Sequence, residues 1–445
     1  MITERELNPK EALKVISSRM LADGFDMLLD LEKSKGMKLY DSSSGKEYLD
    51  FFGFFATNPV GMNHPDMFDP AFLKELQLAA ITKVTNSDIY TRQMAEFVDT
   101  LSTYATPQYM RYFFFVEGGA LAVENALKTA FDWKVRKNKE KGIKGEVGGK
   151  IIHLKEAFHG RSGYTLSLTN TYDPKKTLYF PKFDWPRVTN PKIQFPLTRE
   201  SIAKVEQLEQ KSISEIEESF EKYGDDIAAF IMEPIQGEGG DNHFRKEYFK
   251  KAIETVHKHD ALFIVDEVQS GMGITGKWWA HEHFDIQPDV MAFGKKSQVC
   301  GIMAGPKVDE VKDNVFHVSS RINSTWGGNL ADMVRATKYI QIMKEHNLIK
   351  NAEEMGKVMV KMLGEISDKY PTLVQNPRGR GLMDAIDLRG EKERDEFFSK
   401  MYSKGVLLLK AGEKTIRFRP PLILEEDHIN ILSERMDSVL AEMSR

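Results

Sequence analysis

The 445-residue sequence contains a single cysteine, Cys300. One thiol cannot close an intrachain disulfide or build a cysteine-type zinc site, which excludes a secreted disulfide scaffold, and we expect no metal. The N-terminus, Met-Ile-Thr-Glu-Arg-Glu-Leu, lacks the apolar core of a secretory signal. Apolar runs such as residues 261–265 fall far short of the roughly 18 residues of a membrane helix. We therefore expect a cytoplasmic protein with no membrane partner.

An excess of basic charge is also missing. The chain has 62 Lys and Arg against 66 Asp and Glu, which gives a formal net charge of −4. A nearly neutral chain does not carry the basic surface typical of a nucleic-acid partner. Hydrophobic residues make up 41% and charged residues 29%, which is the composition of an ordinary globular protein.

Short apolar runs alternate with helical patterns over residues 112–293. This alternation predicts βαβ units, and hence an α/β fold with a mostly parallel sheet. The expected strands are 112–116, 150–154, 227–232, 261–265 and 290–293, and the expected helices are 121–136, 200–223 and 246–259. Residues 134–150, rich in Lys and Gly, indicate a solvated helix end and loop.

The pattern changes after about residue 330. A helical tract runs to Lys369 with a break near Asn347, a strand pattern follows Gly379-Arg-Gly381, and a last helix starts at Glu426. We interpret this as a smaller α+β domain that the N-terminal segment completes. The predicted division is 1–70 for the N-terminal part of the small domain, 71–330 for the large domain and 331–445 for the C-terminal part of the small domain.

Two local motifs favour structural interpretations. The run of Phe51, Phe52, Phe54 and Phe55 is more typical of a core or a subunit interface than of a cofactor site. Residues 271–277 satisfy two glycine-rich nucleotide-binding patterns. However, no strand leads directly into them, and Trp278 stands where a magnesium-binding Ser or Thr is needed. We therefore expect a glycine-rich turn beneath an active site.

Polar and glycine residues follow several strands at the point where each strand ends, which is where ligands bind in open α/β sheets. These groups are Gly118-Gly119-Ala120, Phe158 to Arg161, Glu233, Glu238, Asp266, Gln269 and Lys295. Backbone N–H groups at a helix start favour a phosphate. A phosphate cradle, an aromatic face, an aspartate and a lysine are together what pyridoxal phosphate (PLP) requires. Chemistry alone leaves Lys295 and its neighbour Lys296 as alternatives for the cofactor lysine.

At this point the sequence resembles class III (omega) aminotransferases, with PLP-dependent transferase fold type I, over nearly its whole length. The matching segments are Ile264 to Gly271, Gly273 to Lys277, Pro288-Asp289 with Lys295, Phe158-His159-Gly160, Glu233 to Gly240 and Ser324 to Asn329. Gly118-Gly119-Ala120 departs from the usual Ser-Gly-Thr, and Ile274 stands where many members carry Arg. These departures, with residues 416–421, are similar to the lysine ε-aminotransferase branch.

The resemblance implies a role for each matched residue. Lys295 would bind PLP covalently and move the proton, and Asp266 would hold the ring nitrogen protonated. Phe158 and Val268 would pack on the two ring faces, and Gln269 would reach the ring hydroxyl at the edge of the substrate site. Gly119 and Ala120 would bind the phosphate, together with Thr325 from a neighbouring subunit. The active form would then be a homodimer with shared active sites.

The branch resemblance also implies two substrates, L-lysine and 2-oxoglutarate. Arg161 would bind the distal carboxylate of either one, and Arg417 the carboxylate beside the reacting carbon. Glu238 would pair with Arg417 while lysine is bound and move aside for the keto acid. Three alternatives stay open: another ω-aminotransferase acting on ornithine, 4-aminobutyrate or a diamine; a racemase of the same fold; and a nucleotide-binding switch or ATPase.

Overall fold

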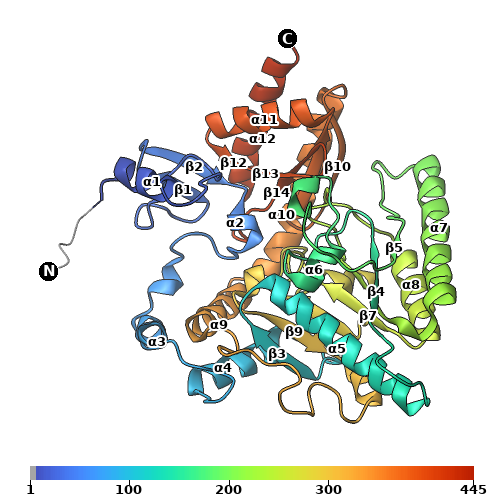
Figure 1. Ribbon diagram of the computed structural model, residues 1–445. Coiled ribbons are helices and arrows are strands. Elements are labelled where there is room, and N and C mark those ends of the chain that lie inside the picture. The colour runs from blue at the N-terminus through green and yellow to red at the C-terminus, as the bar shows by residue number, and fades with distance from the viewer. Residues whose placement is uncertain (1–6) are drawn as a thin grey trace.

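A seven-stranded sheet forms the centre of the larger part of the protein in the computed structural model, which describes residues 7–445 (Figure 1). Its strand order is β3-β9-β8-β7-β6-β4-β5. Strand β9 is antiparallel to both of its neighbours, and the other pairs are parallel, so the expected mostly parallel sheet is confirmed. The bounds are β3 Tyr112–Val116, β4 Lys150–Leu154, β5 Arg187–Val188, β6 Ile227–Met232, β7 Leu262–Asp266, β8 Val290–Phe293 and β9 Cys300–Ala304.

Both faces of this sheet are buried, because successive side chains of a strand point to opposite faces. In β7, Ile264 packs with the cluster that includes α5 (Gly119–Glu140). Phe263 and Val265 pack with the cluster that includes α8 (Lys246–Lys258) and α9 (Leu330–Glu345). Strands covered on both faces read as continuous apolar runs, which is why the sequence shows them clearly.

Helix α5 differs from its predicted range at both ends. It begins at Gly119 directly after Gly118, whose φ of 111° favours glycine, and it continues to Glu140. The interpretation of residues 134–150 as solvated is wrong at Lys134, which is 0% exposed. Its ammonium donates to the carbonyl oxygen of Asp260 at 2.8 Å and lies 3.3 Å from Oδ1 of Asp225. The buried amine therefore ties α5 to the segments that directly precede β6 and β7.

Two smaller sheets lie outside the seven-stranded sheet. One has the order β10-β11-β14-β13, and the other has the order β1-β2-β12. Leu49 of β2 pairs in parallel register with Val406 of β12, so the N-terminal segment lies against the C-terminal part of the chain. The predicted domain division and its boundaries stay a prediction. The bounds are β1 Lys38–Asp41, β2 Lys46–Asp50, β10 Val374–Arg380, β11 Met383–Leu388, β12 Val406–Leu407, β13 Leu409–Ala411 and β14 Thr415–Phe418.

The predicted break in the long helical tract lies at Asn347, which has a left-handed φ of 51° between α9 and α10. Throughout residues 7–445 the structure has no helix with the length and apolar character that a bilayer crossing requires. The remaining helices are α1 Pro9–Ser17, α2 Gly53–Ala56, α3 Pro70–Ile81, α4 Arg92–Thr100, α6 Gly163–Leu168, α7 Arg199–Tyr223, α10 Leu348–Lys369, α11 Glu391–Ser403 and α12 Glu426–Met443.

The glycine-rich segment after β7 is a turn that packs against α9 and α10. Gly273 and Gly276 both have positive φ. A Cβ atom on Gly276 would lie 2.8 Å from Cβ of Glu353, and one on Gly273 would lie 3.0 Å from Met343. The next helical segment is a short 3-10 turn, Ala280–Phe284. These glycines therefore allow close packing between the two parts of the chain, as a structural turn would.

The aromatic run at residues 51–55 divides between core and surface. Phe51 is fully buried, whereas Phe55 is 55% exposed. Residues Gly53 to Ala56 all have positive φ, and a Cβ on Gly53 would lie 2.2 Å from the carbonyl oxygen of Arg419. This tight left-handed turn sends the chain toward Thr57, which reaches the pocket described next.

Candidate active site

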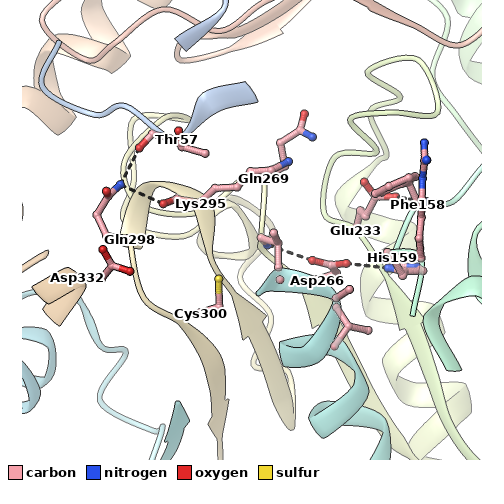
Figure 2. A pocket seen from close by; sticks show the side chains of 16 residues that line it. Thr57, Phe158, His159, Glu233, Asp266, Gln269, Lys295, Gln298, Cys300 and Asp332 are labelled. Atoms are coloured by element: carbon pink, nitrogen blue, oxygen red, sulfur yellow. Dashed lines mark hydrogen bonds and ion pairs between the residues drawn. The ribbon is translucent and has the colours of Figure 1, made fainter. Parts of the chain in front are cut away.

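A cavity of about 600 Å³ lies at the carboxyl ends of β6, β7 and β8, at the start of α5 (Figure 2). This is the edge of the sheet at which the sequence predicts a ligand. Eight of the predicted site residues line the cavity: Gly119, Ala120, Phe158, Arg161, Asp266, Val268, Gln269 and Lys295. Three others, Glu238, Arg417 and Thr325, lie outside its lining.

Lys295 and Lys296 point to different environments. Lys295 lines the cavity, whereas the ammonium of Lys296 donates to the carbonyl oxygen of Ala56 at 2.7 Å. Burial, helped by the positive charge of Arg417, lowers the pKa of Lys295 to about 8. At this pKa about a tenth of the amine is uncharged at pH 7, and the uncharged form is the one that a nucleophile and proton carrier requires. The geometry favours Lys295 as the cofactor lysine.

The backbone that presents Lys295 is held in an uncommon conformation. Lys295 has a φ of 54°, which costs on the order of 1–3 kcal/mol for a residue other than glycine. The backbone N–H of Gln298 donates to the Lys295 carbonyl oxygen at 2.8 Å, and its side-chain amide bonds the same oxygen at 3.2 Å. The amide also donates to the carbonyl oxygen of Thr57 at 2.8 Å. These bonds, drawn in part in Figure 2, fix the lysine loop against the left-handed turn.

Asp266 ends β7 with both carboxylate oxygens occupied. Its Oδ2 lies 2.8 Å from Nδ1 of His159, and its Oδ1 accepts from the Val268 N–H at 3.0 Å. It is nearly buried and still borders the cavity. A carboxylate held in this way can accept a hydrogen bond from a protonated ring nitrogen and stabilise its charge.

Glu233 is a second buried carboxyl group in the cavity wall. It accepts backbone hydrogen bonds from Phe158 and Gly237, each at 3.0 Å. Burial raises the pKa of Glu233 to about 7, and the charge of Asp266 adds to this effect. Glu233 therefore orders the turn that carries Phe158 and His159, and both carboxyl groups border the cavity.

The start of α5 forms a small cradle beside these groups. A Cβ atom on Gly119 would lie 2.9 Å from a methyl group of Val268, so glycine is required for this close approach. A Cβ atom on Gly160 would lie 2.5 Å from the Cβ of Ala120. Free backbone N–H groups at a helix N-terminus bind phosphate through hydrogen bonds and the helix dipole. Because Gly118 and Ala120 lack hydroxyl groups, the backbone supplies the donors that this cradle offers.

Gln269 connects the cavity to two buried arginines. Its Oε1 accepts from Arg417 at 3.4 Å and from Arg419 at 3.2 Å. Because the oxygen is occupied, the amide nitrogen is the group left to donate to a ring hydroxyl. Arg419 is fully buried and pairs with Asp241, which is also fully buried.

Arg417 and Glu238 form the ion pair that the resemblance implies. Nη2 of Arg417 lies 2.8 Å from Oε2 of Glu238 and donates to the Lys410 carbonyl oxygen at 2.7 Å. The Arg417 side chain is 2% exposed and that of Glu238 is 23% exposed. Burial opposes charge on Glu238, but Arg417 and then Lys176 outweigh it, so its pKa lies below the ordinary value. The Arg417 guanidinium thus contacts Glu238 through one nitrogen and Gln269 through another.

The side chains of Arg161 and Thr325 form no hydrogen bond or ion pair with the other predicted site residues, all of which the structure describes. Arg161 borders the cavity, is exposed, and forms no hydrogen bond or ion pair with any residue in the range 7–445. A free guanidinium at the cavity rim can bind a substrate carboxylate. Thr325 is exposed on the surface, where its carbonyl oxygen accepts from Ser87 at 3.1 Å.

His159 and Glu233 lie among the polar groups that the sequence places at strand ends, but the sequence alone assigned neither of them a role. Their roles as supports for Asp266 and Phe158 depend on contacts between strands. Others had no motif that could have marked them, namely Thr57, Gln298, Cys300 and Asp332.

The cavity fits PLP on the residues present. The cradle at Gly119 suits a phosphate, Asp266 suits a ring N–H, and the Lys295 amine suits a covalent link. In addition, Nε2 of His159 is buried with no hydrogen-bond partner within the described chain. Such an orphaned polar atom indicates that a bound group or water completes the site.

Comparisons with known proteins agree with this geometry. The family model described as aminotransferase class-III matches residues 20–440. The chain is 47% identical over 437 residues to the L-lysine-epsilon aminotransferase of Mycobacterium tuberculosis, covering 98% of this chain and 96% of that protein. It is 46% identical to the L-lysine-epsilon aminotransferase of Amycolatopsis lactamdurans, covering 97% of this chain and 96% of that protein.

A solved structure has the same fold. This is the lysine aminotransferase from M. tuberculosis in the internal aldimine form. The two structures superpose with a TM-score of 0.95 at 47% sequence identity, covering 98% of this chain and 99% of that one. Such similarity confirms PLP-dependent transferase fold type I and the PLP cofactor.

The contrast between the two adjacent lysines predicts where the cofactor binds. Borohydride reduction of the holoenzyme followed by peptide mass spectrometry should place the pyridoxyl group on Lys295. Lys295→Ala should abolish turnover, because the variant lacks the amine that lines the cavity. Lys296→Met, which keeps most of the buried side-chain volume, should retain turnover. A pyridoxyl group on Lys296 would show that this assignment is wrong.

Proposed function

This chain belongs to the class-III aminotransferase family, and we propose that it transfers the ε-amino group of L-lysine to 2-oxoglutarate through PLP. The products are L-2-aminoadipate 6-semialdehyde and L-glutamate. The observation that carries the proposal is the Arg417–Glu238 ion pair next to Gln269. An arginine that can exchange this carboxylate for one of the substrate suits two unlike substrates. The full-length similarity to lysine ε-aminotransferases supports lysine as the donor.

When bound, PLP carries the amino group between the two substrates and withdraws electrons from the reacting carbon. The protein holds it through Lys295, Asp266 and the cradle at Gly119. Lys295 Nζ takes the proton from the substrate carbon that bears the nitrogen, because burial lowers the pKa of this amine to about 8 and so makes its uncharged form accessible. Asp266, oriented by His159, stabilises positive charge on the ring nitrogen. Phe158 and Val268 line the cavity where the ring faces would pack.

The two substrates make opposite demands on Arg417. 2-Oxoglutarate has a carboxylate beside its reacting carbon, which a guanidinium binds well. L-Lysine has methylene groups at that place, and a buried unpaired guanidinium beside them would be unfavourable. Glu238 resolves this conflict by pairing with Arg417 while lysine is bound and releasing it for the keto acid. Arg161 at the rim would bind the distal carboxylate of both substrates.

Other amino donors are alternatives with the same site design. Ornithine, 4-aminobutyrate and diamines also present a terminal amine next to methylene groups, so the ion pair alone does not select among them. A racemase does not need an arginine that changes partners. A nucleotide-binding role is not supported, since the glycine-rich turn packs its backbone against α9 and α10.

A homodimer with shared active sites is also part of the proposal. Thr325 lies on the surface, outside the cavity of its own chain. Hydrogen bonds join the segment around Ser87 to the segment that carries Thr325. Large exposed side chains lie on these two segments, namely Ile89, Tyr90 and Trp326. Exposed apolar side chains in one region are typical of an interface. A second copy covering them would bring its Thr325 to the phosphate.

Isotope transfer tests the donor and the position of the amine. With 2-oxoglutarate as acceptor, [ε-¹⁵N]lysine should pass its label to glutamate, and [α-¹⁵N]lysine should not. Nuclear magnetic resonance of the glutamate formed distinguishes the two. Ornithine, 4-aminobutyrate and a diamine, tested in parallel, should react more slowly. Faster transfer from any of these would replace lysine as the donor and leave the aminotransferase class intact.

The two residues of the ion pair should affect different half-reactions. Arg417→Ala should raise the activation barrier of the 2-oxoglutarate half-reaction by about 3 kcal/mol, which slows it roughly 100-fold. The rate of the lysine half-reaction should stay unchanged. Glu238→Gln should slow the lysine half-reaction more, because Arg417 would then lack its anion. Single-turnover absorbance of the cofactor measures both. Equal losses in the two half-reactions, for both variants, would exclude a change of partner.

The phosphate site should depend on the second subunit. Because Gly118 and Ala120 lack hydroxyl groups, loss of the Thr325 hydroxyl should weaken PLP retention by about 1–3 kcal/mol. Equilibrium dialysis of Thr325→Ala against PLP measures this directly. Thr325→Ser, which keeps the hydroxyl, is the matched control and should retain the cofactor. Unchanged retention in Thr325→Ala would exclude the shared phosphate site.

A further inference from the structure

Glu238 contacts two cations, one through each carboxylate oxygen. Its Oε2 lies 2.8 Å from Nη2 of Arg417. Its Oε1 forms a close ion pair with the ammonium of Lys176. The two cations come from separate elements, since Arg417 lies in β14 and Lys176 ends the short 3-10 helix η3, Pro174–Lys176. The carboxylate is therefore a bridge between a fully buried cation and one nearer the surface.

Lys176 stands beside the active-site cavity and is largely shielded from solvent. Its side chain is 16% exposed, and its ammonium lies 5.9 Å from the centre of the Phe158 ring. A second cavity of about 570 Å³ adjoins this position, with both Lys176 and Glu238 in its lining. Arg417 is not part of that lining. The second cavity thus gives the Glu238 carboxylate a place to move away from Arg417.

We propose that Lys176 is a positioning residue that sets substrate choice, by holding Glu238 at the second cavity when Glu238 releases Arg417. The inference rests on the proposed function, because it assigns the second position of the Glu238 side chain. We call Glu238 closed when it contacts Arg417 and open when it contacts Lys176 alone. The closed position serves L-lysine, and the open position serves 2-oxoglutarate or L-glutamate, each of which has a carboxylate beside the reacting carbon.

Lys176 can shift this equilibrium because it interacts differently with the two positions, as any such effect requires. In the closed position the Lys176 ammonium contacts Oε1 of Glu238, and the Arg417 guanidinium contacts Oε2. In the open position both oxygens are free to face the ammonium. Without Lys176, the released carboxylate would have lost its only cation in a half-buried place, and the closed position would be favoured.

The other cations of the second cavity already have acidic partners. Lys410 lies 3.2 Å from Oδ1 of Asp395, and Arg394 pairs with Glu391 at 3.2 Å and with Asp395 at 2.8 Å. Lys175 is exposed, and its backbone N–H donates to Oδ1 of Asp173 at 3.0 Å. Among the cations that line this cavity, Lys176 is therefore the one whose side chain is bound to Glu238.

The test compares Lys176→Met with Lys175→Met, a neighbouring lysine whose ammonium does not contact Glu238. Single-turnover absorbance of the full-length holoenzyme follows the half-reactions with L-lysine and with L-glutamate. Lys176→Met should raise the glutamate concentration for half-maximal rate about three- to tenfold, the effect of losing a partly exposed ion pair. The lysine half-reaction should change less than about twofold, and Lys175→Met should resemble the wild type in both. Lys176→Arg, which keeps the charge, should restore the glutamate value.

A double variant shows whether the effect passes through Glu238. In a Glu238→Gln background, Lys176→Met should have no further effect on the glutamate half-reaction, because the charge that it positions is gone. Equal losses in both half-reactions would overturn the proposal, since they indicate direct contact with substrate or damage to folding. An unchanged glutamate half-reaction, or an additive double variant, would also overturn it. The glutamate half-reaction does not involve lysine, so failure of lysine as donor is recognised separately in the wild-type enzyme.

Discussion

Arg417 is a buried guanidinium that needs an anion beside it, and the design of the candidate site depends on which anion that is. An unpaired charge in this place would cost several kcal/mol. Glu238 supplies the negative charge within the chain, and in the proposed mechanism a substrate carboxylate would take its place. Gln269 and the Lys410 carbonyl also contact the guanidinium and would hold it while the anion changes. On this proposal one site would accept two substrates that differ in the group they present to Arg417.

The positive charge of Arg417 also affects the amine of Lys295, the proposed catalytic group. Burial is the main reason that the pKa of Lys295 falls to about 8, and Arg417 adds to it. Asp266 and Glu233 act in the opposite direction, which limits the fall of this pKa. The acids and bases that border the cavity thus form one electrostatic unit, built from the ends of neighbouring strands and from β14 of the smaller part.

Much of the fold could be predicted from the sequence, because strands buried on both faces appear as continuous apolar runs. The positions of Lys295 and Asp266 at strand ends were also visible, since parallel strands bring their carboxyl ends to one edge. What could not be predicted arises from contacts distant in sequence. Lys134 lies in a lysine-rich stretch that suggests solvent, yet carbonyl groups from another loop bind it. Lys176 lies in no recognisable sequence motif, and its proposed role depends on its contact with Glu238, which is 62 residues away in the sequence.

The central claim is that Glu238 changes partners when the substrate changes. A crystal structure of the aminated enzyme with 2-oxoglutarate bound tests it most directly. The account predicts that the carboxylate beside the keto group contacts Arg417, and that Glu238 has left Arg417 and remains on Lys176. An Arg417–Glu238 contact still at 2.8 Å, with 2-oxoglutarate in place, would contradict the account.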